Sequence, residues 1–568
     1  MPELPKSPDL YIRTLPLLAA LSLLSAPANA ITTNAPQAPV APEFRSEWIQ
    51  SDENAVNRQL IYSGRFYSPD FVRQLYEQNS YRELWTSHRA SPVWMDDLLS
   101  ALDDLRWDAL PRWRYHAENI RRLQSEPERG AVLDLMITDA LVTAVRDLSG
   151  QLVPATALGN NWKLRAAPVD AVALIRQLQR SGQASGLLDA LRPDHPQYAR
   201  LREAYQYNLT REQPLTLSSQ VILRSGDEGP AVGALMQRLE SEGLLALSAI
   251  DRAYPLFDSR VDQAVREFQQ ARGLKADGIV GPATVRALNR SPESIARTIA
   301  LNLQRWRTTP RDFPKTHVFV NSAAFEMSLI EDGKRTLSMP VVVGKRSRQT
   351  PTFADTMDQV ILNPNWNIPT RIAREEILPK IRADRTYAQR IGLRALQGNR
   401  VIDWDEIDDE LLNSPDFPYR LQQAGGDYNS LGRYKFMFPN KYLVYLHDTP
   451  YKYLFNRDVR AFSHGCVRLK EPDRLARHLL AKNGVHEGQV SRIVDSGERR
   501  AYALNEPLPI YLMYLTSWVR DDGQLELYPD NYRIDPTLDH ALVAAGKDPG
   551  TAATLLALAE QIDPAGSL

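Results

Sequence analysis

Residues 460–469 read Arg-Ala-Phe-Ser-His-Gly-Cys-Val-Arg-Leu, and residues 445–449, a short way upstream, read Tyr-Leu-His-Asp-Thr. Cys466 is the only cysteine among 568 residues, so it has no partner for an intramolecular disulfide. It lies two positions after His464 and nineteen after His447. A thiol with an ordinary pKa of about 8.5 is mostly protonated at neutral pH, and a nearby imidazole corrects this. The two stretches therefore predict a cysteine nucleophile with a histidine base.

Two other interpretations of this cysteine are open at this point. A lone cysteine is often a small buried apolar residue, and His447, His464 and Cys466 could be three zinc ligands. Against burial, His464 and Arg468 flank the thiol in a short polar loop. Against zinc, the chain has no Cys-x-x-Cys or His-Glu-x-x-His and no obvious fourth ligand. Gly465 permits a tight turn whose amides could face an oxyanion, so the nucleophile is favoured.

The motif at residues 463–469, with the upstream run at 445–450, resembles the signature of the L,D-transpeptidase family. The chain is most similar to the large Gram-negative members with a YkuD-type catalytic domain, from about residue 50 to 535. The resemblance implies a multidomain α+β fold. A mainly β catalytic domain with a capping insertion would accompany an α-helical scaffold domain and a three-helix peptidoglycan-binding module.

Length and composition limit the number of domains and the class of protein. A chain of 568 residues is too long for one hydrophobic core and indicates several domains. Hydrophobic residues make up 43% and charged residues 24%, as in ordinary globular proteins. The formal net charge of −1 lacks the basic excess that nucleic-acid binding requires.

The N-terminus has the pattern of an export signal. An apolar run at residues 15–24 follows Lys6 and Arg13, and Ala28-Asn29-Ala30 is a small-x-small cleavage site. The run is short for a bilayer span, so we expect a cleaved signal peptide at 1–30 rather than an uncleaved anchor. A Pro/Ala linker at 31–45 follows. We expect a periplasmic protein, soluble or wall-associated, in which an unpaired thiol is more readily explained as a working residue.

Helical periodicity, together with motifs that resemble a known family, divides the first half of the chain into domains. Residues 46–216 are predicted to be a helical scaffold domain, with leucines at three- and four-residue spacing in 98–105. Residues 217–290 form a compact module whose runs Phe-Gln-Gln-Ala-Arg-Gly-Leu (268–274) and Asp-Gly-Ile-Val-Gly (277–281) resemble the peptidoglycan-binding domain. Residues 291–310 are predicted to return to the scaffold as a helix, which would make the module an insertion.

In the second half of the chain, the spacing of the hydrophobic residues changes from a helical pattern to one typical of strands. Residues 311–535 are predicted to be the catalytic domain, with a hairpin turn at 331–334, a strand over 442–447 and a helix over 472–482. An insertion at about 370–431 contains an amphipathic stretch (372–381), an acidic helical stretch (403–412) and a flexible Gly-Gly joint (425–427). The resemblance implies a capping subdomain there; the alternative is a solvated insertion without a role. Residues 536–568 are a tail without an assignment.

The family resemblance also implies roles for the residues around the thiol. Cys466 would be the nucleophile and His447 the general base and acid. Asp448 would orient His447, by its side chain or by its backbone carbonyl. His464 and Gly465, with the Cys466 amide, match the oxyanion side.

Two further residues match substrate-binding positions in the family. Arg468 would hold the loop or a substrate carboxylate, and Tyr445 would line the pocket or pack in the core. The resemblance implies neither a metal nor a cofactor.

The activity implied is the formation of 3→3 cross-links between peptidoglycan stem peptides through a cysteine thioester. A tetrapeptide stem would be the donor and a diaminopimelate-bearing stem the acceptor, and carbapenem β-lactams would be covalent inhibitors. Three alternatives are open: an L,D-carboxypeptidase, a transpeptidase that anchors proteins to the wall, and a non-catalytic wall-binding scaffold.

Overall fold

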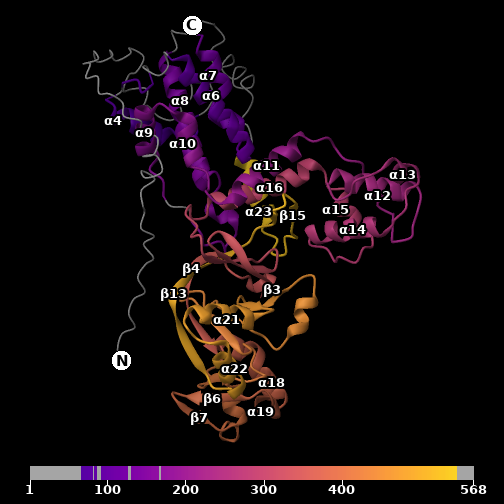
Figure 1. The fold of residues 1–568 in the computed structure, drawn as a ribbon. Coiled ribbons are helices and arrows are strands. Elements are labelled where there is room, and N and C mark those ends of the chain that lie inside the picture. Colours follow the sequence, from indigo (N-terminus) through magenta and orange to yellow (C-terminus); the bar gives the residue numbers. More distant parts are fainter. Residues whose placement is uncertain (1–65, 81, 86–90, 126–129, 166–167, 546–568) are drawn as a thin grey trace. The chain divides into compact units, whose positions relative to one another are not determined.

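The computed structural model describes residues 66–80, 82–85, 91–125, 130–165 and 168–545. The expected signal peptide (1–30), the linker (31–45) and the end of the tail lie outside these residues. The chain divides into two compact units (Figure 1). Of the described residues, unit 1 holds those within 66–153, 168–193 and 542–545, and unit 2 holds 154–165 and 194–541.

Unit 1 is helical and is built around one buried helix. Its helices are α4 (Pro69–Gln78), α6 (Pro92–Asp104), α7 (Ala117–Leu123), α8 (Gly130–Arg146), α9 (Ala171–Ser181) and α10 (Ala184–Ala190). Two buried carboxylates of α8 accept hydrogen bonds from backbone amides of the segments that precede it. Asp139 accepts from the amides of Tyr67 and Ser68, and Asp134 accepts from those of Leu84 and Trp85. These buried acids therefore hold residues 67–68 and 84–85 on α8.

The module predicted at 217–290 is a small helical bundle in unit 2. Its helices are α12 (Pro230–Ser241), α13 (Ala249–Ala253), α14 (Ser259–Ala271) and α15 (Pro282–Leu288), around a shared apolar core. The buried Gln269 explains the motif in the sequence. Its side chain donates to Asp277, Ile279 and Thr284 and accepts from the amide of Gly278. The short α13 was not predicted; Ser248 and Asp251 stabilise it as a capping box.

Two long helices flank this module in the sequence and pack against each other. They are α11 (Pro196–Thr210) and α16 (Pro292–Arg307). Both also contact strand β14 (Ser517–Val519), which forms a hairpin with β15 (Leu525–Leu527). The chain leaves the pair after α11 and returns at α16, so the module lies between them in sequence.

The main sheet of unit 2 has nine strands and closes on itself through the pairing of β2 with β3. The strand order is β11-β3-β12-β10-β9-β4-β13-β1-β2, and β2 also pairs with β3. The strands are β1 (His317–Asn321), β2 (Glu326–Glu331), β3 (Lys334–Gly344), β4 (Phe353–Leu362), β9 (Tyr434–Met437), β10 (Leu446–His447), β11 (Ala461–Ser463), β12 (Val467–Leu469) and β13 (Arg500–Met513). Helix α21 (Pro472–Lys482) packs on β9 and β13, and α22 (Glu487–Ser496) follows it.

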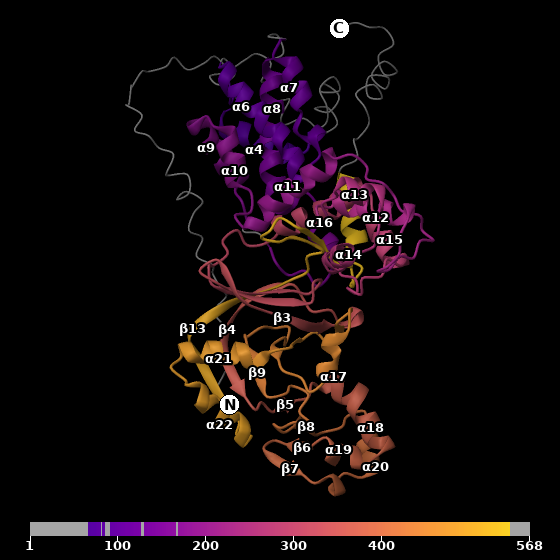
Figure 2. The ribbon, with the colours of Figure 1, turned by 45° about the vertical axis from the view of Figure 1, so that its right-hand side comes forward.

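The insertion between β4 and β9 is a folded subdomain with its own apolar core. Its sheet has the order β5-β8-β6-β7 (Figure 2). The elements are β5 (Trp366–Asn367), α17 (Thr370–Ile372), α18 (Leu378–Ala383), α19 (Thr386–Arg390), β6 (Leu393–Gln397), β7 (Arg400–Ile402), α20 (Asp409–Asn413) and β8 (Arg420–Gln423). A π-helical turn (Ala373–Ile377) joins α17 to α18, so the amphipathic stretch forms one helical run.

Two local predictions were wrong, each because a side chain redirects the backbone. The acidic stretch 403–412 is two pieces, since Asp403 and Asp408 each cap a new turn. The strand predicted over 442–447 is only Leu446–His447, because Asn440 Oδ1 accepts from the amides of Tyr442 and Val444. The Gly-Gly joint is packed: a Cβ on Gly425 would lie 2.8 Å from the carbonyl oxygen of Asn363.

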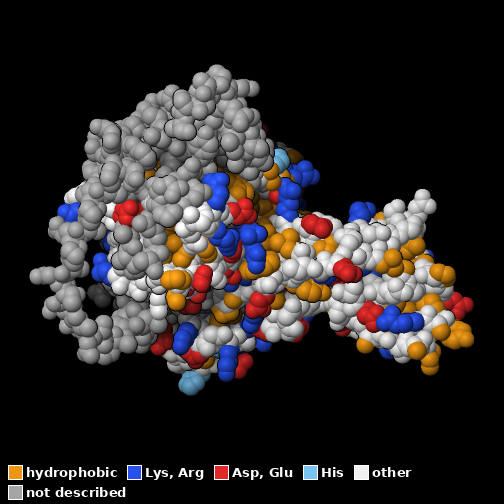
Figure 3. Space-filling view, turned by 90° about the horizontal axis from the view of Figure 1, so that it is seen from above, with side chains coloured by type: hydrophobic (Ala, Val, Ile, Leu, Met, Phe, Trp, Pro, Cys, Tyr) orange, Lys and Arg blue, Asp and Glu red, His pale blue; other side chains and the backbone are white. Residues whose placement is uncertain are grey.

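Charge is not segregated on the face seen in Figure 3, where acidic and basic side chains are interspersed over the described residues. No helix in the described part of the chain has the length and apolar character needed to cross a bilayer.

Candidate active site

The turn that carries Cys466 joins the short strands β11 and β12. Gly465 has φ +121°, a conformation that L side chains rarely adopt, so the turn requires glycine here. The hydroxyl of Ser463 accepts from the Gly465 amide (3.1 Å) and donates to the Cys466 carbonyl (2.5 Å). Ser463 thus fixes the turn from inside, and the Gly465 amide is already engaged.

A second network holds the same turn from the neighbouring strand. Thr350 Oγ1 donates to the Gly465 carbonyl (2.8 Å) and accepts from the Gly344 amide (2.9 Å). The Tyr532 hydroxyl donates to the Gly344 carbonyl (2.8 Å) and accepts from the Thr350 amide (3.2 Å). The backbone around the thiol is therefore fixed before any substrate arrives.

Strand register brings the predicted residues to one face of the sheet. His447 of β10 is paired with Arg468 of β12 and with Lys435 of β9. Because side chains alternate along a strand, these three share one face, and the buried Leu446, Val467 and Phe436 share the other. The Val467 amide donates to the Tyr445 carbonyl (3.2 Å) and extends this pairing. Tyr445 and Cys466 accordingly lie on the face of His447.

His447 is held in the tautomer that a general base needs. Its Nδ1 donates to the backbone carbonyl of Asp448 (2.5 Å), which leaves Nε2 as the acceptor. Burial, with Arg468 and Lys435 nearby, lowers the pKa of His447 to about 3 despite that hydrogen bond. The imidazole is therefore neutral at physiological pH.

The Asp448 side chain serves the loop rather than the imidazole. Its carboxylate accepts from the amides of Arg433 (2.8 Å) and Thr449 (2.7 Å) and pairs with Lys452 (2.6 Å). Of the two possibilities for orienting His447, the structure places the backbone carbonyl in contact with the ring.

Cys466 is half-buried and carries a free thiol. Its Sγ donates to the Leu443 carbonyl at 3.6 Å in this structure. Burial raises the pKa of the thiol, while hydrogen bonds from Tyr445 and the positive charges of Lys435 and Arg468 act to lower it. The resting site therefore holds a thiol and, on the same face of the sheet, a neutral imidazole.

Lys435 is a site residue that the sequence analysis missed. Its Nζ lies 3.8 Å above the centre of the Tyr445 ring, and burial lowers its pKa while Cys466 opposes that shift. The signal in the sequence was a charged residue between Tyr434 and Phe436 in an apolar strand. Its partner across the sheet, His447, could not be read without the register.

We predict that the positive charge of Lys435 lowers the pKa of the Cys466 thiol and so favours its thiolate form. In Lys435→Gln, the pH midpoint for alkylation of Cys466 by iodoacetamide should rise by roughly one pH unit, because an opposite charge favours the ionised thiol. Lys435→Arg keeps the charge and should keep the midpoint. Mass spectrometry follows the reaction cleanly because the chain has one cysteine. An unshifted midpoint in Lys435→Gln would contradict this role.

Arg468 approaches the site from β12. Its guanidinium carbon lies 5.8 Å from the centre of the Tyr451 ring, and burial lowers the pKa of the side chain. Its Nε is buried and has no acceptor among the described residues. One donor of Arg468 is therefore left without a partner in the described part of the structure.

His464 points to the insertion rather than to the thiol. Its Nε2 lies 2.5 Å from Glu376 Oε1, and the adjacent Glu375 forms an ion pair with Arg348 near the catalytic turn. These contacts connect the insertion directly to the loop of Cys466. The alternative of a solvated insertion without a role does not account for these contacts.

The zinc alternative is not supported by the arrangement of these side chains. Throughout the described ranges, no three His, Cys, Asp or Glu side chains converge as a metal site requires.

Comparison with known protein families assigns three regions of the chain. Residues 315–490 match the YkuD family, the L,D-transpeptidase catalytic domain. Residues 70–204 match a scaffold domain, and residues 228–288 match a family described as "Putative peptidoglycan binding domain". Each match lies within the corresponding predicted range, whose outer limits stay predictions.

Individual relatives agree with this assignment over part of their length. A "Putative L,D-transpeptidase" of Haemophilus influenzae is 38% identical over 254 residues, which are 44% of this chain and 50% of the relative. The chain thus spans about half of that protein in the match.

Two further similarities are more local. The N-acetylmuramoyl-L-alanine amidase CwlM of Mycobacterium tuberculosis is 45% identical over 84 residues, 14% of this chain and 21% of that one. A solved L,D-transpeptidase from Mycobacterium smegmatis shares 14% identity over 36% of this chain and 62% of its own, with a TM-score of 0.16.

Proposed function

We propose that this chain, which carries an L,D-transpeptidase catalytic domain beside a scaffold domain and a peptidoglycan-binding domain, joins peptidoglycan stem peptides through a thioester on Cys466. The observation that carries the proposal is the shared face of His447 and Cys466: His447 lies on β10 between Lys435 and Arg468, and Cys466 directly precedes the neighbouring β12. A thiol, a neutral imidazole with a free Nε2 and two cations are the groups that acyl transfer from a carboxylate-bearing peptide requires.

In the first step, Nε2 of His447 removes the thiol proton and Sγ attacks the carbonyl carbon of the donor's third residue. The thiol must first release the Leu443 carbonyl, and such tightening on substrate binding is common in catalytic sites. The Gly465 amide is engaged, so the Cys466 amide is the loop donor assigned to the oxyanion. The C–N bond then breaks, and the departing D-Ala amine takes the proton from His447.

In the second step, the side-chain amine of a neighbouring diaminopimelate attacks the thioester. His447 accepts the proton that this amine loses and returns it to the sulfur. The products are a 3→3 cross-link and the free thiol, so no bond or proton is left unaccounted for. The reaction would take place in the periplasm after removal of the N-terminal signal. Carbapenems would acylate the same sulfur.

The test is a product assay with the chain from residue 31 onward and purified disaccharide-tetrapeptide. Mass spectrometry should show a dimer that has lost one D-Ala, absent with Cys466→Ala. Tripeptide alone would indicate a carboxypeptidase instead, and D-Ala release only with an envelope protein as acceptor would indicate wall anchoring. No reaction by either protein would favour a wall-binding scaffold.

A further inference from the structure

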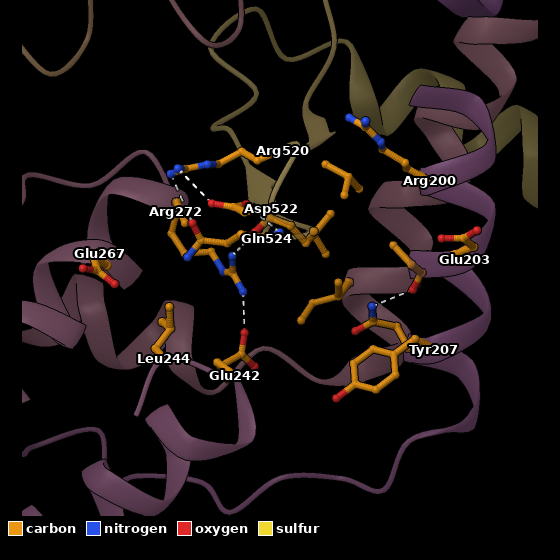
Figure 4. Close-up of a pocket in the computed structure, with 18 of the residues that line it drawn as sticks. Arg200, Glu203, Tyr207, Glu242, Leu244, Glu267, Arg272, Arg520, Asp522 and Gln524 are labelled. Atoms are coloured by element: carbon orange, nitrogen blue, oxygen red, sulfur yellow. Dashed lines mark hydrogen bonds and ion pairs between the residues drawn. The ribbon is translucent and has the colours of Figure 1, made fainter. Parts of the chain in front are cut away.

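A pocket of about 810 Å³ lies in unit 2, away from every residue of the candidate active site. Its walls come from α11, the turn after α12, the end of α14 and the β14–β15 hairpin (Figure 4). The peptidoglycan-binding module therefore supplies one side of the pocket, and α11 and the hairpin supply the other. Neither part forms it alone.

Glu242 on the floor of the pocket is surrounded by more buried positive than negative charge, from Arg211 and Arg272 of the lining and from Arg238 behind it. Glu242 accepts from Arg238 (2.6 Å), Arg272 (2.6 Å) and Arg211 (3.4 Å). The four side chains are 1–11% exposed. Burial acts to raise the pKa of Glu242, but the three guanidinium groups hold it below its ordinary value. One carboxylate therefore faces three cations. Such an excess of buried positive charge raises the free energy of the folded state unless another anion binds beside it.

Two donors on this floor are unused. The Nε atoms of Arg211 and Arg272 are buried, and neither finds an acceptor among the residues that the structure describes. Buried donors in proteins are almost always paired, so two unpaired donors on side chains that line the pocket show that the hydrogen bonding of this floor is incomplete. Burial, together with the like charge of Arg290 and Arg238, lowers the pKa of Arg272 to about 10. Both observations indicate an unmet requirement for an anion.

The mouth of the pocket has different chemistry. Arg200 pairs with Asp521 (2.8 Å), and Arg520 pairs with Asp522 (3.0 Å), while the exposed Glu203 and Glu267 make the rim acidic above the cationic floor (Figure 4). The ring of Tyr207 is 55% exposed, with the guanidinium of Arg211 lying 5.3 Å from its centre. An aromatic surface above a cationic floor suits a ligand with a compact carboxylate on a larger, partly apolar body.

We propose that this pocket binds a carboxylate of a peptidoglycan stem peptide on Arg211 and Arg272, as a second attachment point distinct from Cys466. The proposal rests on the proposed function only in taking peptidoglycan as the ligand. Guanidinium groups bind carboxylates with paired, charge-assisted hydrogen bonds, which supply both affinity and orientation. Because the module and the hairpin share the pocket, a bound stem would also hold the module against the rest of unit 2.

The test is calorimetric titration of the full chain with disaccharide-tetrapeptide, in a Cys466→Ala background that prevents turnover. Arg211→Gln should weaken one binding event at least about tenfold, and a ligand whose carboxylates are amidated should lose the same event. Arg260→Gln is the matched control: this arginine belongs to the same module, is 54% exposed and pairs with Asp251 and Asp258. It should bind as the parent does.

A second measurement separates local loss of binding from misfolding. Hydrogen exchange should slow in residues 241–244 and 519–525 when the acidic ligand is added, and not with the amidated one. Equal affinity for both ligands, or an unaffected Arg211→Gln, would overturn the proposal. If the parent makes cross-links while these comparisons show no difference, the pocket alone is refuted. If binding behaves as expected but no product forms, the proposed function alone is refuted.

Discussion

Cys466→Ala should lower the rate of acyl transfer by at least about 10³-fold, because no other group in the site can form the thioester. Cys466→Ser should be nearly as inactive, since a hydroxyl beside a neutral imidazole is a far weaker nucleophile than a thiol. Ser463 and Thr350 hold the turn through the backbone, so both variants should melt close to the parent. Release of D-Ala from disaccharide-tetrapeptide, followed over time, measures the effect.

The same variant provides a direct chemical readout. A carbapenem should add its mass once to the parent chain, and peptide mapping should place it on Cys466. The adduct should be absent in Cys466→Ala, in which no cysteine remains. An adduct on another residue, or turnover by the alanine variant within tenfold of the parent, would refute the assignment of the nucleophile.

His447→Gln should lower kcat/KM by roughly 10²–10⁴-fold, the range that general-base catalysis contributes. The parent should show a flat profile of kcat/KM between pH 5 and 8. The sign follows from the low pKa of about 3: the ring loses its proton well below this range and is already the neutral base throughout it. An acidic limb with a midpoint near 6.5 would mean that His447 titrates normally.

His478→Gln is the matched control for this variant. His478 lies on α21 and contacts Glu331 at 3.0 Å, outside the face that carries Cys466. Its loss should leave the rate within twofold of the parent. An equal loss in both histidine variants would indicate a general effect on folding and would remove the case for His447 as the base.

Local sequence patterns predicted the elements whose causes are local. The helix over 472–482 was predicted with its observed ends, because Pro472 starts it, leucines repeat along one side and Gly484 stops it. The hairpin turn at 331–334 likewise agrees with β2 and β3. The family motif added Cys466 and His447, which alternation alone would not distinguish from other polar residues.

The parts that were missed depend on contacts between distant segments. Lys435 joins the site only through its register with His447, and Glu376 reaches His464 from another subdomain. The strand that ends at His447 is short because the side chain of Asn440 binds the backbone of the preceding loop. The spacing of hydrophobic residues gives no sign of this interaction. Such effects require the tertiary structure.

The closure of the main sheet limits how a peptide can add to it. In that sheet every strand except β11 has at least two neighbours. The free backbone groups that an extended ligand could pair with, in the manner of β-augmentation, are therefore those of Ala461–Ser463. This edge runs directly into the turn of Cys466. A donor stem that docks as an added strand is thus delivered along the one open edge to the sulfur.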